Sequence, residues 1–166
     1  METKDLGAGR VEPAEERSVR MPGGRLVTTK VAAERTGWAY SLFEVEVGTG
    51  GGEVPHVQHR EDEYIYVIDG RFDFLVEGVA SGAGPGTHLF VPRGALHAYE
   101  NAGDGAGRLL VVHTPGGSQE SFLAAAGEPT TGSRDHAGRD HRGFALLAAE
   151  HGIEICKTRE TTKRSF

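Results

Sequence analysis

The sequence has very little cysteine, no long apolar run and no excess of positive charge. Cys156 is the single cysteine of 166 residues, so no disulfide can form within the chain, which is typical of a reducing compartment. No stretch approaches the roughly 20 apolar residues of a transmembrane helix, and the charged N-terminal segment lacks the apolar core of a secretory signal. Lys and Arg number 18 against 24 Asp and Glu. The net charge of −6 argues against nucleic acid or an anionic membrane as a partner, and we expect a cytoplasmic protein.

Glycine is abundant instead, with 25 residues, about twice its average share. Glycine-rich turns separate short segments in which apolar and polar residues alternate, as in Phe43 to Val47, and this pattern predicts β-strands. Strands are expected over residues 26–33, 38–47, 64–69, 72–78, 88–92, 97–101 and 108–114. The glycine-rich segments 48–55 and 81–86 are expected to be irregular. Many short strands with such turns predict an all-β sandwich or barrel.

The chain divides into three parts by composition. Residues 1–24 are charged and contain proline and a glycine pair, so we expect a flexible N-terminal arm. Residues 25–117 hold the strands of the barrel. Residues 118–166 are expected to form a helical extension and tail, with one helix over 118–128 that opens on Ser118 and a second over 144–152.

Two segments concentrate residues that can bind a metal. On a strand, His56 and Gln58 point to one face, and a short loop then delivers Glu63 to the next strand. His97 follows a Pro-x-Gly turn about 40 residues later in the chain. Imidazole and carboxylate ligands together suit a first-row transition metal, and two histidines with one carboxylate form the minimal set of non-haem iron enzymes. His88 and His113 also lie on expected strands and are interpreted as ordinary core or rim residues.

At these residues the sequence resembles the cupin superfamily, and in particular its single-domain, quercetinase-like bacterial members. The first cupin motif, G-x5-H-x-H-x(3,4)-E-x6-G, is matched in spacing by Gly50, His56, position 58, Glu63 and Gly70. The second, G-x5-P-x-G-x2-H-x3-N, is matched at every position by Gly86, Pro92, Gly94, His97 and Asn101. The resemblance implies a double-stranded β-helix, or jelly-roll barrel. It also implies one divalent metal (Fe, Ni, Mn, Cu or Zn) held by His56, Gln58, Glu63 and His97.

The second histidine of the first motif is replaced by Gln58. The neighbouring His59 would satisfy the shorter spacing to Glu63, but it would place Val57 at the first ligand position, and a valine binds no metal. We therefore align His56 and Gln58 with the two histidines and interpret His59 as a supporting or surface residue. Three alternatives remain open here: a His–Gln–Glu–His site, a three-ligand His–Glu–His site, and a barrel that has lost its metal.

The resemblance implies an enzyme that acts on an aromatic, enolic or polyketide-like small molecule, with dioxygenase-like chemistry as the leading hypothesis. Glu63 would be both ligand and base, and Tyr99, which shares a face with His97, is a second candidate for acid–base chemistry. One alternative is an isomerase or cyclase that uses the metal as a Lewis acid or acid–base groups alone. The other is a ligand-binding protein without catalysis. A homodimer is also expected from the resemblance.

Overall fold

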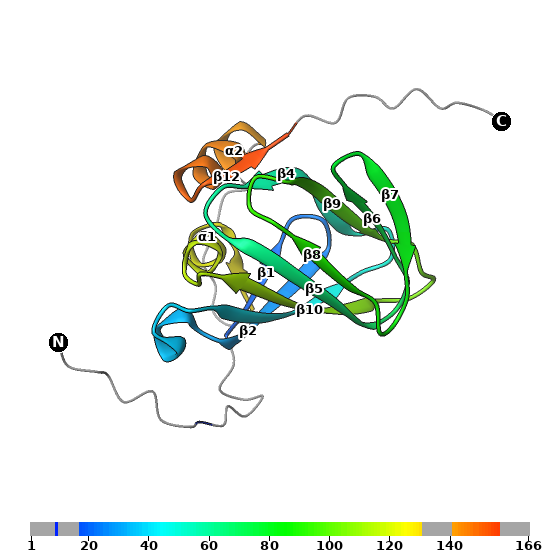
Figure 1. Cartoon of the computed structure of the whole chain (residues 1–166), viewed down its shortest axis with the longest axis horizontal. Helices are drawn as coiled ribbons and strands as arrows, with labels where there is room; N and C mark the ends of the chain where they lie inside the picture. The colour runs from blue at the N-terminus through cyan, green and yellow to red at the C-terminus, as the bar shows by residue number, and fades with distance from the viewer. Residues whose placement is uncertain (1–8, 10–16, 131–140, 157–166) are drawn as a thin grey trace.

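Two antiparallel sheets build a barrel in the computed structural model, which describes residues 9, 17–130 and 141–156 (Figure 1). The seven-stranded sheet has the order β11–β1–β2–β3–β10–β5–β8. Its strands are β1 (Arg17–Met21), β2 (Arg25–Val31), β3 (Ser41–Val47), β5 (Asp62–Asp69), β8 (His88–Val91), β10 (Gly107–Thr114) and β11 (Glu128–Pro129). The five-stranded sheet has the order β12–β4–β9–β6–β7. Its strands are β4 (Gly52–Gln58), β6 (Phe72–Val76), β7 (Val79–Ala83), β9 (Leu96–Asn101) and β12 (Ile153–Ile155).

Side-chain alternation explains how the strands face the barrel interior. Along β10, every second residue is buried, from Leu109 through Val111 to His113, while the residues between them are more exposed. Inward side chains from both sheets meet in one apolar core, which includes Phe43, Phe72 and Phe74. Burial of each such side chain contributes about 1.5–3 kcal/mol to the stability of the fold. The core therefore fixes the register of the strands.

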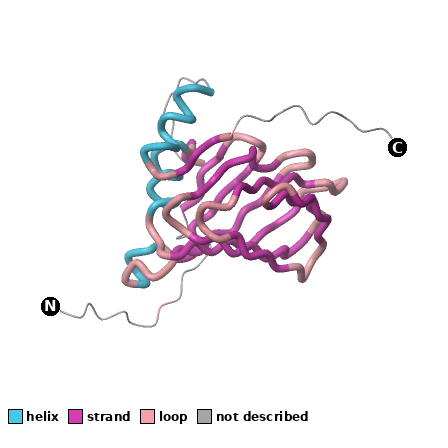
Figure 2. Tube along the Cα trace, turned by 45° about the horizontal axis from the view of Figure 1, so that its top comes forward, coloured by secondary structure: helices cyan, strands magenta, loops and turns pink. Residues whose placement is uncertain are grey.

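The helices gather on one side of the barrel (Figure 2). They are a 3-10 helix (Ala33–Thr36), α1 (Ser118–Ala126) and α2 (His141–Glu150). Phe122 of α1 packs edge-on against Phe144 of α2 with ring centroids 5.5 Å apart. After α2, β12 pairs with β4 and covers the edge of the five-stranded sheet. None of the described helices has the length and hydropathy needed to cross a membrane.

The start of α1 differs from the predicted cap. Ser118 is the first helical residue, and Gly117 occupies the N-cap position without a side-chain hydrogen bond. The backbone amides of Ser118 and Gln119 instead donate to the two carboxylate oxygens of Glu61, over 2.7 and 2.9 Å. A carboxylate suits this position because the first amides of a helix lack partners within the helix and carry partial positive charge. The cap therefore comes from a distant loop, which local sequence could not indicate.

Part of the predicted N-terminal arm is a strand. Residues 17–21 form β1, which pairs with β2 and β11, and Met21 lies in the core. The rest of the predicted arm, apart from Gly9, lies outside the described residues, as do positions 131–140 and 157–166 of the predicted extension. The local sequence hides this strand, because only Val19 and Met21 of its five residues are apolar and Arg17 and Arg20 are exposed.

The two glycine-rich segments also contain strand residues. Residues 52–55 begin β4, where the glycine backbone at Gly52 lies so close to the carbonyl of Tyr99 that a Cβ atom would collide with it. Residues 81–83 end β7 and pair with β6. Glycine is ordinarily a turn residue, but here it permits the close approach of one strand to another.

Candidate metal centre

Two histidines face each other across adjacent strands. His56 on β4 and His97 on β9 are register partners in the five-stranded sheet, and their ring centroids are 4.1 Å apart. Both side chains point inward and only 2% of each is exposed. β4 contains a bulge between Glu53 and His56, and this bulge brings His56 into register with His97. The pairing makes one compact imidazole site from positions 41 residues apart in sequence.

Backbone carbonyls fix the orientation of both rings. The Nδ1 atom of His56 lies 2.9 Å from the carbonyl oxygen of Val54, and the Nδ1 atom of His97 lies 3.0 Å from that of Ala95. Each Nδ1 therefore donates its proton to the residue two positions earlier, and each Nε2 is directed into the barrel. Histidines that ligate metals are oriented in this way by a hydrogen bond on the second nitrogen.

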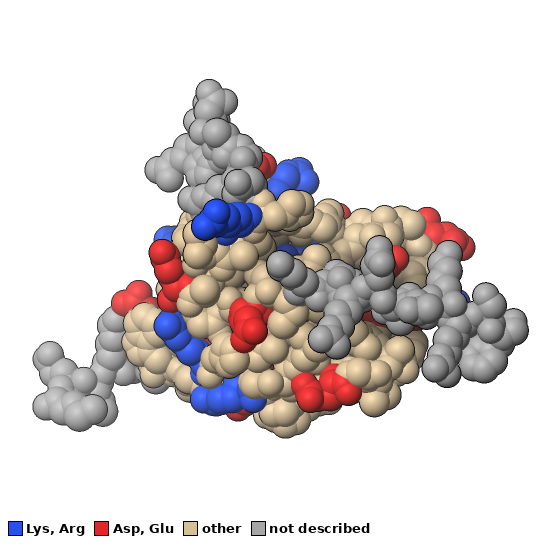
Figure 3. Space-filling view, turned by 90° about the horizontal axis from the view of Figure 1, so that it is seen from above, with Lys and Arg blue, Asp and Glu red and all other residues tan. Residues whose placement is uncertain are grey.

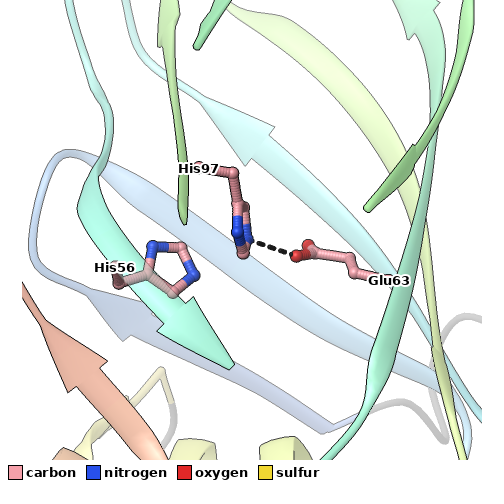
Figure 4. A group of neighbouring side chains, drawn as sticks. All are labelled: His56, Glu63 and His97. Carbon is pink, nitrogen blue, oxygen red and sulfur yellow. Dashed lines mark hydrogen bonds and ion pairs between the residues drawn. The ribbon is translucent and has the colours of Figure 1, made fainter. Parts of the chain in front are cut away.

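Glu63 brings a carboxylate to these rings from the other sheet. It lies on β5, and its Oε2 atom is 2.8 Å from the Nε2 atom of His97 (Figure 4). Ligand atoms of His56, Glu63 and His97 all lie within 4.8 Å of one another, and the three side chains are buried. Figure 4 shows the three side chains converging from three separate strands.

The charges of this cluster stabilise one another. Burial opposes ionisation of Glu63, but nearby histidines outweigh it, namely His113, His97 and His56, and lower the pKa of Glu63 to about 2. Burial also opposes the charge on His97, but the hydrogen bond and charge of Glu63 raise the pKa of His97 to about 9. Burial lowers the pKa of His56 and keeps that imidazole neutral. In this structure His97 and Glu63 thus form a buried ion pair beside a neutral imidazole.

The donor set fits a divalent first-row metal. The Nε2 atom of His56 is buried and has no hydrogen-bond partner among the described residues, which is costly for a polar atom unless a ligand satisfies it. A neutral imidazole with a free lone pair, a second imidazole and an ionised carboxylate are the groups such a metal binds. His56, Glu63 and His97 would hold the metal, and its binding would displace the proton from His97.

Gln58 lies beside the same carboxylate. It follows His56 by two residues on β4, is buried, and its Nε2 atom donates to Glu63 Oε2 over 3.4 Å. The structure therefore brings together all four residues predicted as ligands. The role of Gln58 as a metal ligand through its amide oxygen stays a prediction. His59 lies outside the site: it is exposed, and its Nε2 atom is 3.0 Å from Glu154 on the protein surface.

Tyr99 belongs to a neighbouring polar cluster that also contains Arg25 and Glu53. The Nη1 atom of Arg25 lies 2.6 Å from Glu53 Oε1, and 7% of Arg25 is exposed. Burial, followed by the charge of Glu53, raises the pKa of Tyr99, so its hydroxyl stays protonated at neutral pH. Tyr99 packs against Phe72 and Phe74, with ring centroids 6.2 and 5.8 Å away. Its role in acid–base chemistry stays a prediction.

The cavities around the cluster are unequal in size. Two interior cavities of about 20 Å³ each lie beside it, and both are lined by Arg25, Glu53 and Gln119. A groove of about 450 Å³ lies beside the bulged part of β4, and Glu53 and Tyr99 line both this groove and one interior cavity. These two residues therefore border both the groove and the barrel interior.

Sequence reasoning missed two buried residues next to Glu63. His113 is 2% exposed, with its Nε2 atom 3.8 Å from Glu63 Oε1 and its Nδ1 atom 3.6 Å from Glu61 Oε2. Burial raises the pKa of Glu61, against the opposing effects of His113 and the two helix amides. The alternation along β10 placed His113 on the same inward face as Leu109 and Val111, and that signal was available in the sequence. Nothing in the local pattern marks Glu61. His88, by contrast, lies exposed on β8.

The fold and site together define an all-β jelly-roll barrel with a buried His/Glu cluster between its sheets. Residues 41–113 match the Cupin domain family model, in agreement with the two motifs. A search of curated proteins finds no match. The narrower likeness to quercetinases stays a prediction.

Solved structures with the same fold come from several organisms. KdgF from Halomonas sp. is 17% identical with a TM-score of 0.61, covering 69% of this chain and 99% of that one. The polyketide cyclase RemF from Streptomyces resistomycificus is 21% identical with a TM-score of 0.57, covering 87% and 96%. A sugar phosphate isomerase from Silicibacter pomeroyi is 20% identical with a TM-score of 0.53, covering 64% and 75%. At these identities the similarity establishes the fold alone.

Proposed function

We propose that the protein is a metal-dependent enzyme acting on an aromatic, enolic or polyketide-like small molecule. One observation carries the proposal. Ligand atoms of His56, His97 and Glu63 lie within 4.8 Å of one another, while both Nδ1 atoms are already hydrogen-bonded to the backbone. This arrangement satisfies the ligand count, the donor types and the supporting hydrogen bonds that metal sites require.

The ligand set favours dioxygenase-like chemistry. Two histidines and one carboxylate leave coordination positions open and are the set that non-haem iron oxygenases use. A first-row metal at this site supplies a Lewis acid for a substrate oxygen and, when it is redox-active, electron transfer to O₂. The protein would supply orientation through Glu63 and exclusion of water by the phenylalanines of the core.

The cluster of Tyr99, Arg25 and Glu53 supports an oxygen-rich, partly apolar substrate. The protonated Tyr99 hydroxyl can donate to an enol or carbonyl oxygen, and Glu53 can accept from a hydroxyl. Phe74, Leu75 and Ala98 line the adjoining groove and offer apolar contact for a ring system. We infer that the substrate approaches the cluster from this groove, past Glu53 and Tyr99.

A Lewis-acid isomerase or cyclase is the second candidate, and Gln58 favours it. An amide oxygen is a harder and weaker donor than imidazole, so replacing a histidine by Gln58 weakens the ligand set most for a redox metal. Such an enzyme would rearrange its substrate without consuming O₂. Glu63 or Tyr99 would then transfer the proton.

The test uses the full-length protein reconstituted separately with Fe²⁺, Mn²⁺, Ni²⁺ and Zn²⁺. Flavonol and polyketide-like enols are offered in an oxygen electrode, and products are analysed by mass spectrometry. Uptake of O₂ that matches substrate loss supports the dioxygenase. Product of unchanged mass, formed equally well without O₂, supports the isomerase or cyclase. If the metal binds but no substrate is converted while ligands still bind, the protein is a binding module and the enzyme proposal is wrong.

Matched variants identify the residues responsible. Glu63→Gln and His97→Ala are expected to abolish activity, whereas Glu154→Gln, which alters only the surface pair with His59, is expected to retain it. Gln58→His restores the motif histidine. This variant is expected to raise the affinity for metal. If the protein is a dioxygenase, the variant is also expected to raise its activity with iron.

We further infer that the protein is a homodimer and does not bind nucleic acid. On the outer face of β5 and β8, Tyr66 and Phe90 are 44% and 49% exposed, and the Tyr64 ring lies tilted against Phe90 with ring centroids 4.7 Å apart. An exposed aromatic cluster of this kind favours a contact with a second copy. Basic and acidic side chains are interspersed on the face shown in Figure 3, which supports the absence of a nucleic-acid surface there.

A further inference from the structure

Each oxygen of the Glu63 carboxylate has its own neighbours. Oε2 lies 2.8 Å from His97 Nε2 and 3.4 Å from Gln58 Nε2, so this atom faces the predicted metal ligands. Oε1 faces His113, whose Nε2 atom is 3.8 Å away. His113 lies outside the group of donor atoms within 4.8 Å of one another, so it is placed behind the carboxylate and does not join the ligand cluster.

The other side of His113 faces a second buried acid. Its Nδ1 atom lies 3.6 Å from Glu61 Oε2 and, within the part of the chain that the structure describes, has no hydrogen-bond partner although it is buried. The ring is also held edge-on by Phe43, with centroids 5.7 Å apart and planes at 70°. The ring plane is thus constrained by packing while its two nitrogens point at two carboxylates.

Glu61 is fixed in turn by the start of α1. Its two oxygens accept the amides of Ser118 and Gln119 over 2.7 and 2.9 Å, and only 3% of the residue is exposed. The Ser118 hydroxyl donates to the carbonyl of His151 over 2.6 Å, which ties the same point to the turn after α2. A continuous line of contacts therefore runs from both helices through Glu61 and His113 to Glu63.

We propose that His113 and Glu61 are positioning residues that hold Glu63 in its ligating orientation, so that docking of α1 sets the metal affinity of the barrel. This inference rests on the proposed metal-dependent function. A glutamate side chain has three rotatable bonds, and a buried carboxylate with only one oxygen contacted can rotate out of a ligand position. Contacts to the non-ligating oxygen remove that freedom, and outer-shell partners of this kind typically change metal affinity by about 10–100-fold.

The first measurement is the dissociation constant for Co²⁺, obtained by competition with a chelator on the full-length protein. His113→Leu is expected to weaken binding by about 10–100-fold, and His113→Gln, which keeps a donor, by less. Glu61→Gln is also expected to weaken binding. Because Glu61 acts through His113, the double variant is expected to bind as His113→Leu does, without a further loss.

Glu120→Gln is the matched control. Glu120 is another acid at the start of α1, where it accepts the amide of Ala33 over 2.8 Å and faces the Ser41 hydroxyl at 3.4 Å. It has no contact with His113 or Glu63 among the hydrogen bonds and ion pairs of the described residues. The Glu120→Gln variant is expected to lower the melting temperature about as much as Glu61→Gln does, but to leave the Co²⁺ affinity within about twofold of wild type. Equal losses of affinity in both variants would show a purely structural effect and overturn the proposal.

Two further readouts separate this inference from the proposed function. If wild type binds Co²⁺, His97→Ala does not, and His113→Leu binds like wild type, only the positioning role is wrong. A His113→Leu visible spectrum that shows loss of a Co²⁺ ligand would make His113 a ligand and also overturn it. If wild type binds no metal, the proposed function fails. Crystal structures then decide the inference: in His113→Leu, Glu63 either leaves His97, which supports positioning, or stays, which refutes it.

Discussion

The buried pair of His97 and Glu63 is expected to make the stability of the chelator-treated protein depend on pH, and Glu63→Gln should remove that dependence. The pKa of His97 is about 9 in the folded protein, against an ordinary value of 6.5. A group whose pKa is raised by folding contributes its full stabilisation below the unfolded pKa and loses it as the pH rises through the folded one. Each unit of pKa difference corresponds to about 1.36 kcal/mol, so the contribution of the pair to the free energy of unfolding falls by about 3 kcal/mol between pH 6.5 and 9.

Urea unfolding in the presence of a chelator at pH 6 and pH 9.5 measures this loss as a change in the free energy of unfolding. The wild type is expected to lose about 3 kcal/mol more than Glu63→Gln over this interval. Glu154→Gln is the control, because it alters the exposed pair of His59 and Glu154, and such surface pairs contribute about 0–1 kcal/mol. Equal pH slopes for wild type and Glu63→Gln would refute the assignment of the ion pair.

Three other predictions follow from the same contacts. Zn²⁺ affinity is expected to rise about tenfold per pH unit between 6.5 and 9, because the metal must displace the His97 proton, and a flat competition profile over this range would contradict it. Arg25→Met is expected to lower the free energy of unfolding by about 3 kcal/mol, because Glu53 loses its 2.6 Å partner; urea titration showing a loss below 1 kcal/mol would mean that the pair is effectively solvated. Phe90→Glu is expected to shift the protein from dimer to monomer in light scattering at micromolar concentration, and a monomeric wild type would disprove the homodimer itself.

The sequence was sufficient to predict the all-β cupin fold and the approach of the four predicted ligands. Motif spacing selected His56, Gln58, Glu63 and His97, whose role as metal ligands stays a prediction, and strand alternation placed His56 and Gln58 on one face with His59 outside it, as in the structure. These inferences succeeded because they depend on a period of two residues within a strand and on turns of fixed length.

Other features depend on pairing between distant segments. The cap of α1 comes from Glu61, 57 residues before Ser118, so no local pattern could indicate it. Arg25 directly precedes the strand predicted over residues 26–33, but its side chain is buried and lies 2.6 Å from Glu53. β1 lies within the predicted arm, and its stability comes from pairing with β2 and from burial of Met21, which the composition of residues 17–21 does not reveal. In each case tertiary contacts outweigh what the local composition favours.

The central claim is that His56, Glu63 and His97 hold a metal, and elemental analysis of protein purified without an affinity tag or chelator tests it most directly. Wild type and Glu154→Gln are expected to contain close to one first-row metal per chain, and Glu63→Ala and His97→Ala are expected to contain almost none. A wild type that carries no metal and takes up no added Fe²⁺, Mn²⁺, Ni²⁺ or Zn²⁺ would contradict the account. So would equal metal content in all four proteins, which would place the metal elsewhere.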